Sequence, residues 1–418
     1  MSGPERRAGR RAALLAALLC IAAPSPLRAQ EAEDSPDPAP TLAFDGELRL
    51  RGEADGRTVG VGDDYAVLSR LRLGARVGWS DWIRVYARLQ DARAWGEESS
   101  TLTDASADAL DIHEAWAELG RPEEIAARLG RQELALADER LVGAVGWTNT
   151  GRSFDGARAL GRLGDVAWTA FWMNVAERDS ITSIGLDPQG NQGRDDDGWL
   201  LGAHTATDAG PVRGELTLLH DRNGATDESW TANLRVHGRT GGFLFDVAGA
   251  WQGGPDRRAW FASGRVGAVL GRLTLAAQAD LLSGADEPGA GDRKAFHTLY
   301  ATNHKFYGYM DYFLAIPGGL DEAGLVDAIL RASWRLSERS TLRADLHRFW
   351  TAEERGGESA LGSELDLVGD WRFAAPATLE AGGGMFFPEP LAEEVLPAFA
   401  GGDDATWWGY VQLTLRWP

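Results

Sequence analysis

From residue 44 onward, short segments of this chain alternate strictly between apolar and polar residues, and this period of two constrains the fold more than any other feature. Phe44, Leu48 and Leu50 fall on one side of a β-strand, and Arg49 and Arg51 fall on the other. Comparable alternation occupies eight further segments, residues 70–77, 83–90, 230–237, 243–251, 326–335, 342–347, 361–372 and 407–417. The pattern predicts an all-β chain of antiparallel strands.

Alternation alone fits a soluble β-sandwich as well as a membrane barrel, but three features favour the barrel. Tryptophans concentrate at strand ends, where an interfacial girdle would lie, at Trp79, Trp82, Trp95, Trp251, Trp334, Trp350 and Trp371. Short turns alternate with long polar loops at residues 179–198, 283–304 and 388–404. The last strand ends on the aromatic Trp417. We therefore expect a transmembrane antiparallel up-and-down β-barrel with a polar lumen.

The strand count follows from the same pattern. About nineteen segments qualify, whereas a bacterial single-chain barrel has an even number of strands. We predict 18 strands, with 16 as the alternative, and expect the surplus segment to lie at residues 307–313. A barrel of this size leaves an aqueous lumen rather than a packed core.

The N-terminal residues predict that the chain is secreted before it reaches a membrane. Residues 1–29 combine arginines, an apolar run over residues 12–23 and a small residue, Ala29, which is typical of a secretory signal. Residues 30–41 form an acidic, Pro-rich linker, and residues 42–418 form the barrel. No later stretch approaches 18 uninterrupted apolar residues, which excludes a protein that crosses with helices. We expect the outer membrane as the location and its lipid bilayer as a partner.

The net charge and the cysteine content limit the partners and cofactors that the protein can have. The formal net charge of −20 argues against nucleic acid as a partner. Of the 42 basic residues, all but Lys294 and Lys305 are arginines. The single cysteine, Cys20, lies in the signal, so the mature chain has no thiol, disulfide or Cys-bound metal, and no cofactor is expected.

The arginines on the polar face must point into the lumen, because an Arg on the lipid face costs about 2–4 kcal/mol at the bilayer midplane. The lumen candidates that the residues themselves suggest are Arg70, Arg72, Arg84 and Arg93. Rings or ladders of Arg select anions, and the planar guanidinium suits a carboxylate. The alternative is that these arginines pair with Asp and Glu and only stiffen the wall.

No catalytic constellation is present, and we expect no enzyme. His113-Glu114 lacks the second histidine of a zinc protease motif, and no G-x-S-x-G sequence occurs. Asp195 and Asp197 in a polar loop are weak candidates for Ca²⁺ ligands. A solvated loop is favoured, because their spacing is not that of an EF-hand.

Two dense stretches carry a family resemblance. Residues 129–158 contain LGRQEL, DERLVG, GWTN and GRSFDGAR, and residues 294–311 contain KAF, LY and TNHKFYGYMD. Both stretches resemble the alginate-export family of outer-membrane β-barrels. The resemblance implies an 18-stranded barrel whose Arg-lined constriction conducts a polyuronate and whose loops can occlude the pore.

The resemblance also implies roles for individual residues. The ligands for uronate carboxylates would be Arg131, Arg140, Arg152 and Arg158. Asn149 would bond sugar hydroxyls, while the supporting carboxylates would be Asp138, Glu139 and Asp155. The alternative is structural: these charges form an inward ion-pair network that shapes the barrel.

We therefore expect an outer-membrane channel that passes an anionic polysaccharide or oligosaccharide, such as an alginate-like polyuronate. The alternatives are a general or small-anion porin and a plugged structural barrel with no transport role. A periplasmic export scaffold is a further partner that this function would admit.

Overall fold

The computed structural model describes residues 40–95, 110–176, 198–207, 210–223, 227–289, 291 and 293–418. The expected signal at residues 1–29 and nearly all of the expected linker lie outside the described residues. The first strand begins at Thr41, one residue before the expected start of the barrel.

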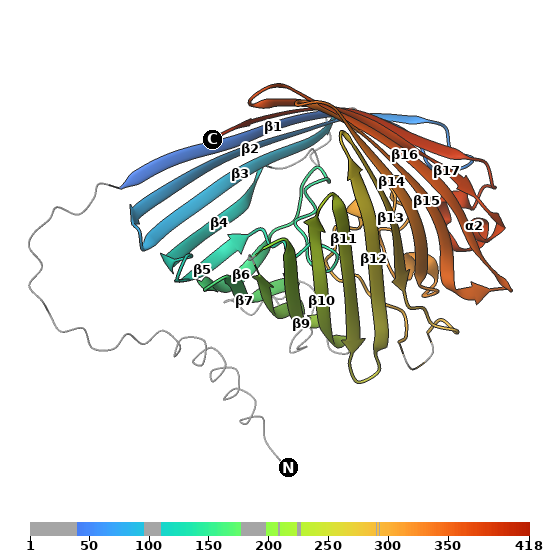
Figure 1. The fold of residues 1–418 in the computed structure, drawn as a ribbon, viewed down its shortest axis with the longest axis horizontal. Coiled ribbons are helices and arrows are strands. Elements are labelled where there is room, and N and C mark those ends of the chain that lie inside the picture. The colour runs from blue at the N-terminus through green and yellow to red at the C-terminus, as the bar shows by residue number, and fades with distance from the viewer. Residues whose placement is uncertain are drawn as a thin grey trace, which may run out of the picture. The chain divides into compact units, whose positions relative to one another are not determined.

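The chain forms a closed antiparallel barrel in which each strand pairs with the next (Figure 1) and β1 pairs with β18. Its 18 strands confirm the predicted fold and count. Their bounds are β1 (Thr41–Gly56), β2 (Asp64–Ser80), β3 (Ile83–Trp95), β4 (Leu110–Arg121), β5 (Ile125–Gln132), β6 (Phe154–Leu163), β7 (Val166–Ala176), β8 (Gly198–Thr207), β9 (Val212–Asn223), β10 (Glu228–Thr240), β11 (Phe243–Gly253), β12 (Arg258–Leu270), β13 (Leu273–Leu282), β14 (Leu325–Ser337), β15 (Ser340–Arg355), β16 (Glu358–Ala374), β17 (Ala377–Pro388) and β18 (Thr406–Trp417).

The two ends of the barrel differ. The hairpin turns β2–β3, β6–β7, β10–β11, β12–β13, β14–β15 and β16–β17 hold only two residues each and lie at the end where β1 starts and β18 stops. The opposite end carries the long loops, although its β15–β16 turn also holds only two residues. We call the two ends the short-turn end and the long-loop end. None of the described helices is long and apolar enough to cross a membrane.

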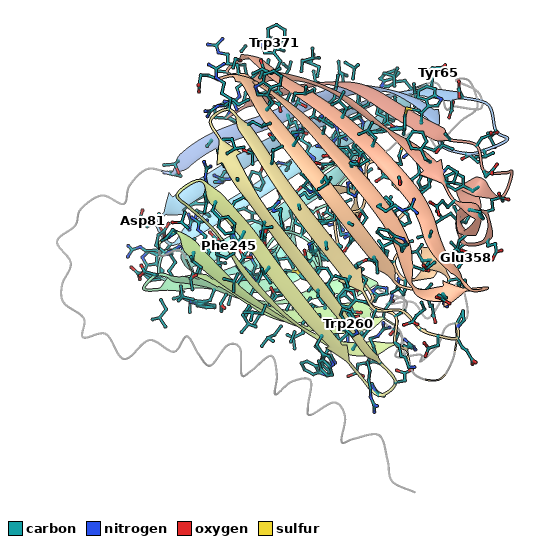
Figure 2. The ribbon with its side chains drawn as sticks, turned by 45° about the vertical axis from the view of Figure 1, so that its right-hand side comes forward. Tyr65, Asp81, Phe245, Trp260, Glu358 and Trp371 are labelled. Atoms are coloured by element: carbon teal, nitrogen blue, oxygen red, sulfur yellow. The ribbon has the colours of Figure 1, made fainter. Side chains whose placement is uncertain are left out.

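Side-chain exposure alternates along the strands as the sequence predicts. Arg49 is 4% exposed and its neighbour Leu50 is 41% exposed, so the arginine faces the lumen and the leucine faces outward. Outward-facing tryptophans gather near both ends of the strands, and Figure 2 shows Trp371 and Trp260 at opposite ends of the wall. At the short-turn end these are Trp79, Trp82, Trp334, Trp371 and Trp417, and at the long-loop end Trp95, Trp230, Trp251, Trp260 and Trp407. Exposed apolar walls between two aromatic girdles are the surface that a bilayer requires.

The lumen departs from the expected water-filled channel. The β5–β6 loop (residues 133–153), the β13–β14 loop (residues 283–324) and the β17–β18 loop (residues 389–405) contribute buried apolar side chains to a core inside the barrel. This core includes Leu134, Leu141, Val142, Phe296, Tyr307, Met310, Phe313, Leu391 and Phe399. The surplus segment at residues 307–313 belongs to the β13–β14 loop and forms no strand, as predicted.

The loop elements are short: η2 (Asn303–Lys305) and η3 (Gly318–Leu320) in the β13–β14 loop, and α2 (Pro390–Val395) and η4 (Pro397–Phe399) in the β17–β18 loop. The loops called polar at residues 283–304 and 388–404 are therefore partly apolar and buried. The loop expected at residues 179–198 lies, except for Gly198 in β8, outside the described residues.

Candidate functional site

The β5–β6 and β13–β14 loops, which hold the two sequence motifs, bind each other inside the lumen. Val142 and Tyr300 form an isolated parallel β-bridge. The backbone N–H of Gly143 donates to Tyr300 O (2.9 Å), and that of Thr302 donates to Glu139 O (3.0 Å). The two motifs therefore make one structural unit.

Glycines in both motifs are required by this packing. A Cβ on Gly143 would lie 2.1 Å from Thr302 Oγ1. Gly308 has a left-handed backbone (φ +82°), and a Cβ there would lie 2.3 Å from Glu364 Oε1 on the wall. Since real Cβ contacts are not this short, a side chain at either glycine would displace a loop.

Arg140 fixes the β5–β6 loop to strand β13. Its guanidinium donates to Asp280 (2.8 Å), which is fully buried, and to Asp138 (3.3 Å), and lies 4.0 Å from the centre of the Phe306 ring. Burial opposes the charge, but Asp280, Tyr307 and Asp138 outweigh it and raise the pKa of Arg140. Arg140 therefore stays charged as a clamp between the loops and the wall.

Four arginines on β1 and β2 hold the tip of the β5–β6 loop. We call Arg49, Arg51, Arg70 and Arg72 the arginine ladder, and residues 145–151 the finger. All four face the lumen and are buried. They donate mainly to main-chain carbonyls of the finger: Arg49 to Gly146 O (3.0 Å), Trp147 O (3.1 Å) and Thr148 O (2.8 Å), Arg51 to Trp147 O (3.0 Å), Arg70 to Gly146 O (3.1 Å) and Thr148 O (3.0 Å), and Arg72 to Thr150 O (3.1 Å).

The β13–β14 loop rests on a pair of carboxylates on β16. Met310 N–H donates to Glu364 Oε1 (2.8 Å), and Tyr309 N–H donates to Asp366 Oδ2 (3.3 Å). Both carboxyl side chains are almost fully buried. Gly384 leaves room for this seat, because a Cβ there would lie 2.4 Å from Asp366 Oδ1.

Stacked rings connect the two loops across the lumen. The Trp147 ring lies parallel to the His304 ring with centroids 4.3 Å apart, and the His304 ring stacks on Tyr309 at 5.0 Å. The Arg51 guanidinium lies 4.2 Å from the Trp147 ring centre. The finger is thus held by rings as well as by hydrogen bonds.

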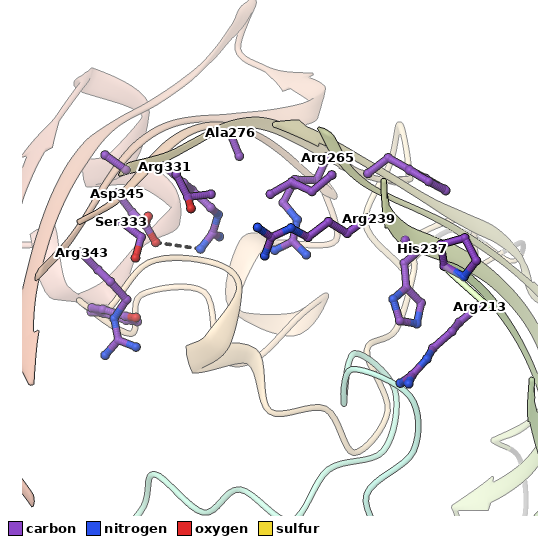
Figure 3. A pocket seen from close by; sticks show the side chains of 16 residues that line it. Arg213, His237, Arg239, Arg265, Ala276, Arg331, Ser333, Arg343 and Asp345 are labelled. Carbon is purple, nitrogen blue, oxygen red and sulfur yellow. Dashed lines mark hydrogen bonds and ion pairs between the residues drawn. The ribbon is translucent and has the colours of Figure 1, made fainter. Parts of the chain in front are cut away.

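An open cavity of about 730 Å³ lies in the lumen near the short-turn end. Its wall comes from the short-turn ends of strands β9 to β15, and Tyr309 of the β13–β14 loop also lines it. Figure 3 shows the side chains of Arg239, Arg265 and Arg331 reaching into it. The charged and polar residues that line it are Arg213, His237, Arg239, Arg265, Arg331, Ser333, Arg343 and Asp345.

The charge of this cavity is only partly neutralised. Arg331 pairs closely with Asp345 (2.7 Å), whereas the Arg343 guanidinium lies 3.4 Å from Glu380 and 3.8 Å from Asp370. Arg265 shares Asp246 (3.0 Å) with another arginine. Within the described part of the chain, the Arg239 guanidinium has no hydrogen bond or ion pair. Five arginines against one lining carboxylate make the cavity a cationic chamber.

A model of the alginate export family matches residues 41–389. The chain belongs to the alginate export family. Its 18-stranded barrel is similar to solved outer-membrane proteins. OpdK from Pseudomonas aeruginosa is 12% identical with a TM-score of 0.60, covering 90% of this chain and 98% of that one. OccAB4 from Acinetobacter baumannii is 11% identical with a TM-score of 0.61, covering 92% and 100%.

OccK9 from P. aeruginosa is likewise similar, at 13% identity and a TM-score of 0.61, covering 90% of this chain and 98% of its own. No curated protein matches the chain. Family membership identifies an outer-membrane channel, and these neighbours share its barrel fold.

In this alginate export family member, most of the predicted lumen arginines already have protein partners. Arg70 and Arg72 hold the finger, Arg140 clamps the loops, and Arg84 pairs with Glu118 (3.0 Å) on β4. Asn149 bonds the wall, donating to Ser69 O (3.2 Å) and Arg93 O (3.1 Å) and accepting from Arg49 (3.3 Å).

Arg152 and Arg158 are less engaged. Arg152 donates to Tyr300 O (2.5 Å), and burial lowers the pKa of Arg152. Arg158 follows the inward register of Phe154 on β6, and within the described residues its side chain makes no hydrogen bond or ion pair. These two remain predicted contacts for an anion.

Two predicted lumen residues face the other way. Arg131 shares the outward register of Leu129, and Arg93 shares that of Leu89. Arg131 binds Asp155 through both carboxylate oxygens (2.8 and 2.9 Å), and Arg93 binds Asp91 (2.7 Å). The expectation that Arg131 and Arg93 line the pore is therefore corrected: both lie on the outer face near the long-loop end. The alternation in the sequence already indicated this orientation, because each arginine lies an even number of residues from an outward-facing leucine.

The predicted supporting carboxylates divide in the same way. Asp138 binds Arg140 and lies 3.7 Å from Arg235, both of them lumen arginines. Glu139 instead accepts from Thr302 Oγ1 (2.7 Å) and pairs with Lys305, which joins the two loops. Asp155 supports Arg131 outside the lumen. Asp195 and Asp197 lie outside the described residues.

Sequence analysis missed the cationic chamber. Arg331, Arg343 and Arg239 stand on the polar face of strands that the alternation predicts. Arg265 lies on β12, a strand outside the predicted segments. Two features of the sequence could have indicated these arginines: each lies on the polar face of its strand, and each lies close to a short turn. The chamber was not found because its residues are spread over seven strands and carry no motif.

Proposed function

We propose that this channel passes an anionic saccharide through its lumen, and that the cationic chamber is where the saccharide's carboxylates bind. The observation that carries the proposal is the 730 Å³ cavity lined by five arginines and one carboxylate. A guanidinium offers a carboxylate two parallel, charge-assisted hydrogen bonds.

The composition of the chamber suits a sugar acid. Tyr309 offers a ring, Ser333 a hydroxyl, and the arginines offer charge, so one wall can contact both the sugar and its carboxylate. The arginines come from separate strands, which spreads binding over several weak sites. Conduction requires this, because a single tight site would release its ion slowly.

A second candidate is a channel for small carboxylates. One structural neighbour, OpdK from P. aeruginosa, has been solved with vanillate; it is 13% identical with a TM-score of 0.58, covering 90% of this chain and 99% of that one. Vanillate is a monocarboxylate, and the same chamber arginines would bind such an ion. The two candidate functions differ in whether an anionic saccharide chain enters the pore and blocks the current of small ions.

The test is single-channel current of the refolded protein in a planar bilayer at low salt, with and without oligogalacturonate. We expect a current that the oligomer blocks and that a neutral maltooligosaccharide of equal length leaves unchanged. The doubly substituted variant Arg239→Gln/Arg343→Gln should raise the half-blocking concentration about 10-fold or more, because charged hydrogen bonds contribute about 1.5–3 kcal/mol each.

The control is Arg131→Gln, which removes one guanidinium from the outer face, and we expect the oligomer to block it as it blocks wild type. A current that vanillate reduces but oligogalacturonate does not would support the small-carboxylate channel instead. Absence of any current would support a plugged structural barrel.

A further inference from the structure

We infer that a second cavity, at the long-loop end, is a binding site for a small organic carboxylate with an apolar body. The cavity has a volume of about 490 Å³ and lies between the β13–β14 loop, the β11–β12 turn and Asp227 beside β10. We call it the loop pocket; Arg257, Arg293, His297, Leu314, Ile316 and Gly318 are among the residues that line it. It shares no lining residue with the cationic chamber, and its arginines lie outside the barrel strands.

Main-chain contacts fix the sides of the loop pocket. Arg257 and Arg293 form an isolated parallel β-bridge, and Arg258 N–H donates to Arg293 O (3.0 Å). The backbone N–H of His297 donates to Gln252 Oε1 (2.9 Å), and Gln252 Nε2 donates to His297 O (2.8 Å). The volume is within the range of about 300–1,000 Å³ that is typical of small-molecule sites. The loop pocket is therefore preformed, and no loop has to move to create it.

Arg257 offers donors that the protein leaves unused. It is 5% exposed, and within the described residues its side chain makes one hydrogen bond, to Asp227 Oδ1 (3.2 Å). Its Nε is buried without an acceptor. Arg293 donates to the same oxygen of Asp227 (2.6 Å) and lies 3.3 Å from Asp256. Two guanidinium groups on one carboxylate oxygen leave N–H groups available to a second carboxylate.

His297 adds a neutral donor to the loop pocket. Its Nδ1 accepts the Leu299 N–H (2.9 Å), so the neutral ring carries its proton on Nε2. Within the described part of the chain, that Nε2 makes no hydrogen bond. Burial, Arg257 and Arg293 lower the pKa of His297 to about 4, and Asp227 opposes them. The suppressed protonation of the ring indicates an environment that favours an anion.

The remaining lining is largely apolar and indicates what the carboxylate is attached to. Leu299, Leu314, Ile316 and Pro317 line the loop pocket. Among the large apolar side chains of the β13–β14 loop that the structure describes, Leu314 alone is exposed, at 47%. A hydrocarbon ring or chain would cover this leucine, whereas a bare inorganic anion or the hydroxyls of a sugar would not.

A bound carboxylate would satisfy both sides of the loop pocket. Its oxygens would accept from Arg257 and from the Nε2–H of His297, and hydrogen bonds between charged groups are about twice as strong as neutral ones. Its negative charge would raise the pKa of His297, because an opposite charge within about 4–6 Å favours the imidazolium. Since the ligand would contact the β13–β14 loop and the β11–β12 turn together, binding would stabilise that loop.

The first measurement uses benzoate as the probe and the imidazole of His297 as the reporter. The refolded protein carries ¹⁵N-labelled histidine, and its ring signals are followed by NMR at pH 6.5. We expect benzoate to shift the His297 signals saturably, and benzamide, the uncharged analogue, to leave them unchanged. At saturating benzoate we expect the pKa of His297 to rise from about 4 to about 5 or above.

The second measurement fills the loop pocket. No atom lies within 4 Å of a Cβ on Gly318, so Gly318→Leu would occupy the cavity without a clash. We expect this variant to raise the Kd for benzoate about 10-fold or more. The matched control is Gly291→Leu, the same change at an equally unobstructed position of the same loop that does not line the cavity. It should bind benzoate like wild type.

A third variant removes the charge. Arg257→Gln keeps a polar side chain but loses the guanidinium, and we expect the Kd for benzoate to rise about 10-fold, as for the loss of one charge-assisted hydrogen bond. The chamber variant Arg239→Gln/Arg343→Gln should bind at the loop pocket like wild type.

Three results would overturn the inference. The first is the absence of a saturable shift in wild type. The second is benzoate binding to Gly318→Leu as tight as to wild type, or benzamide binding as tight as benzoate. The third is a His297 response that the chamber variant abolishes and Arg257→Gln retains, which would place benzoate in the chamber. Because this assay needs no ion current, its outcome is independent of the bilayer test of the proposed function.

Discussion

Gly308 is the residue on which the seating of the β13–β14 loop depends most directly. Gly308→Ala would force a Cβ into Glu364 at a left-handed backbone position, at a cost of about 1–3 kcal/mol. We expect faster hydrogen exchange throughout the β13–β14 loop, measured by mass spectrometry. Gly318→Ala in the same loop meets no atom within 4 Å and should exchange like wild type. Equal exchange in both variants would contradict this reading.

His297 makes the β13–β14 loop sensitive to acid. Burial and the nearby Arg257 lower the pKa of His297 to about 4, and its Nδ1 accepts the Leu299 N–H (2.9 Å). The folded loop therefore holds the ring neutral, while the unfolded ring titrates near 6.5. Stability from this group is complete above pH 6.5 and is lost as the pH falls towards 4, by about 3 kcal/mol.

The measurement is NMR titration of the imidazole, with proteolysis of the loop at pH 7.5 and 4.5. His297→Gln keeps an acceptor for Leu299 but does not titrate, so its loop should lose less protection on acidification. An imidazole that titrates near 6.5, or equal acid sensitivity in the variant, would refute this account.

Whether a single side chain faces the lumen or the lipid could be predicted wherever its place in the alternating strand pattern was used. The alternation predicts that Arg49 and Arg70 face the lumen, and they do. The same rule places Arg131 with Leu129 on the outer face, but the motif resemblance assigned it to the pore. The hydrogen-bond partners of these arginines were harder to predict. They are main-chain carbonyls of the finger, which lies 76–99 residues further along the chain.

At the scale of elements, the β5–β6 and β13–β14 loops act as one body that Arg140 clamps to the wall. Arg140→Met would leave the buried Asp280 without its cationic partner, and breaking a buried ion pair typically costs about 3–5 kcal/mol. We expect the loops to become protease-sensitive while the barrel stays intact. Arg140→Met/Asp280→Asn should recover much of the loss, because it removes the unpaired charge as well.

A double-mutant cycle on protease resistance measures this coupling. Purely additive losses would mean that Arg140 and Asp280 do not stabilise each other.

The strands of the barrel were predictable because the hydrophobicity of each alternates with a period of two, whereas the inward loops have no such period. Their apolar residues, such as Phe296, Met310 and Phe313, were visible in the sequence, but nothing in it showed that they fold inward.

At the scale of the whole molecule, charge distribution matters more than net charge. The formal net charge of −20 would favour cations if it governed the pore. The lumen surfaces described here are instead cationic at the ladder and in the chamber. The barrel and its 18 strands follow from the sequence, but the position of the chamber required the register of seven strands to be known together.

The central claim is that this lumen selects anions. The direct measurement is the reversal potential of the reconstituted channel in a KCl gradient, because its sign reports which ion carries the current. We predict the sign of an anion-selective pore, reduced in Arg239→Gln/Arg343→Gln and unchanged in Arg131→Gln. A cation-selective potential in the wild-type channel would contradict the account.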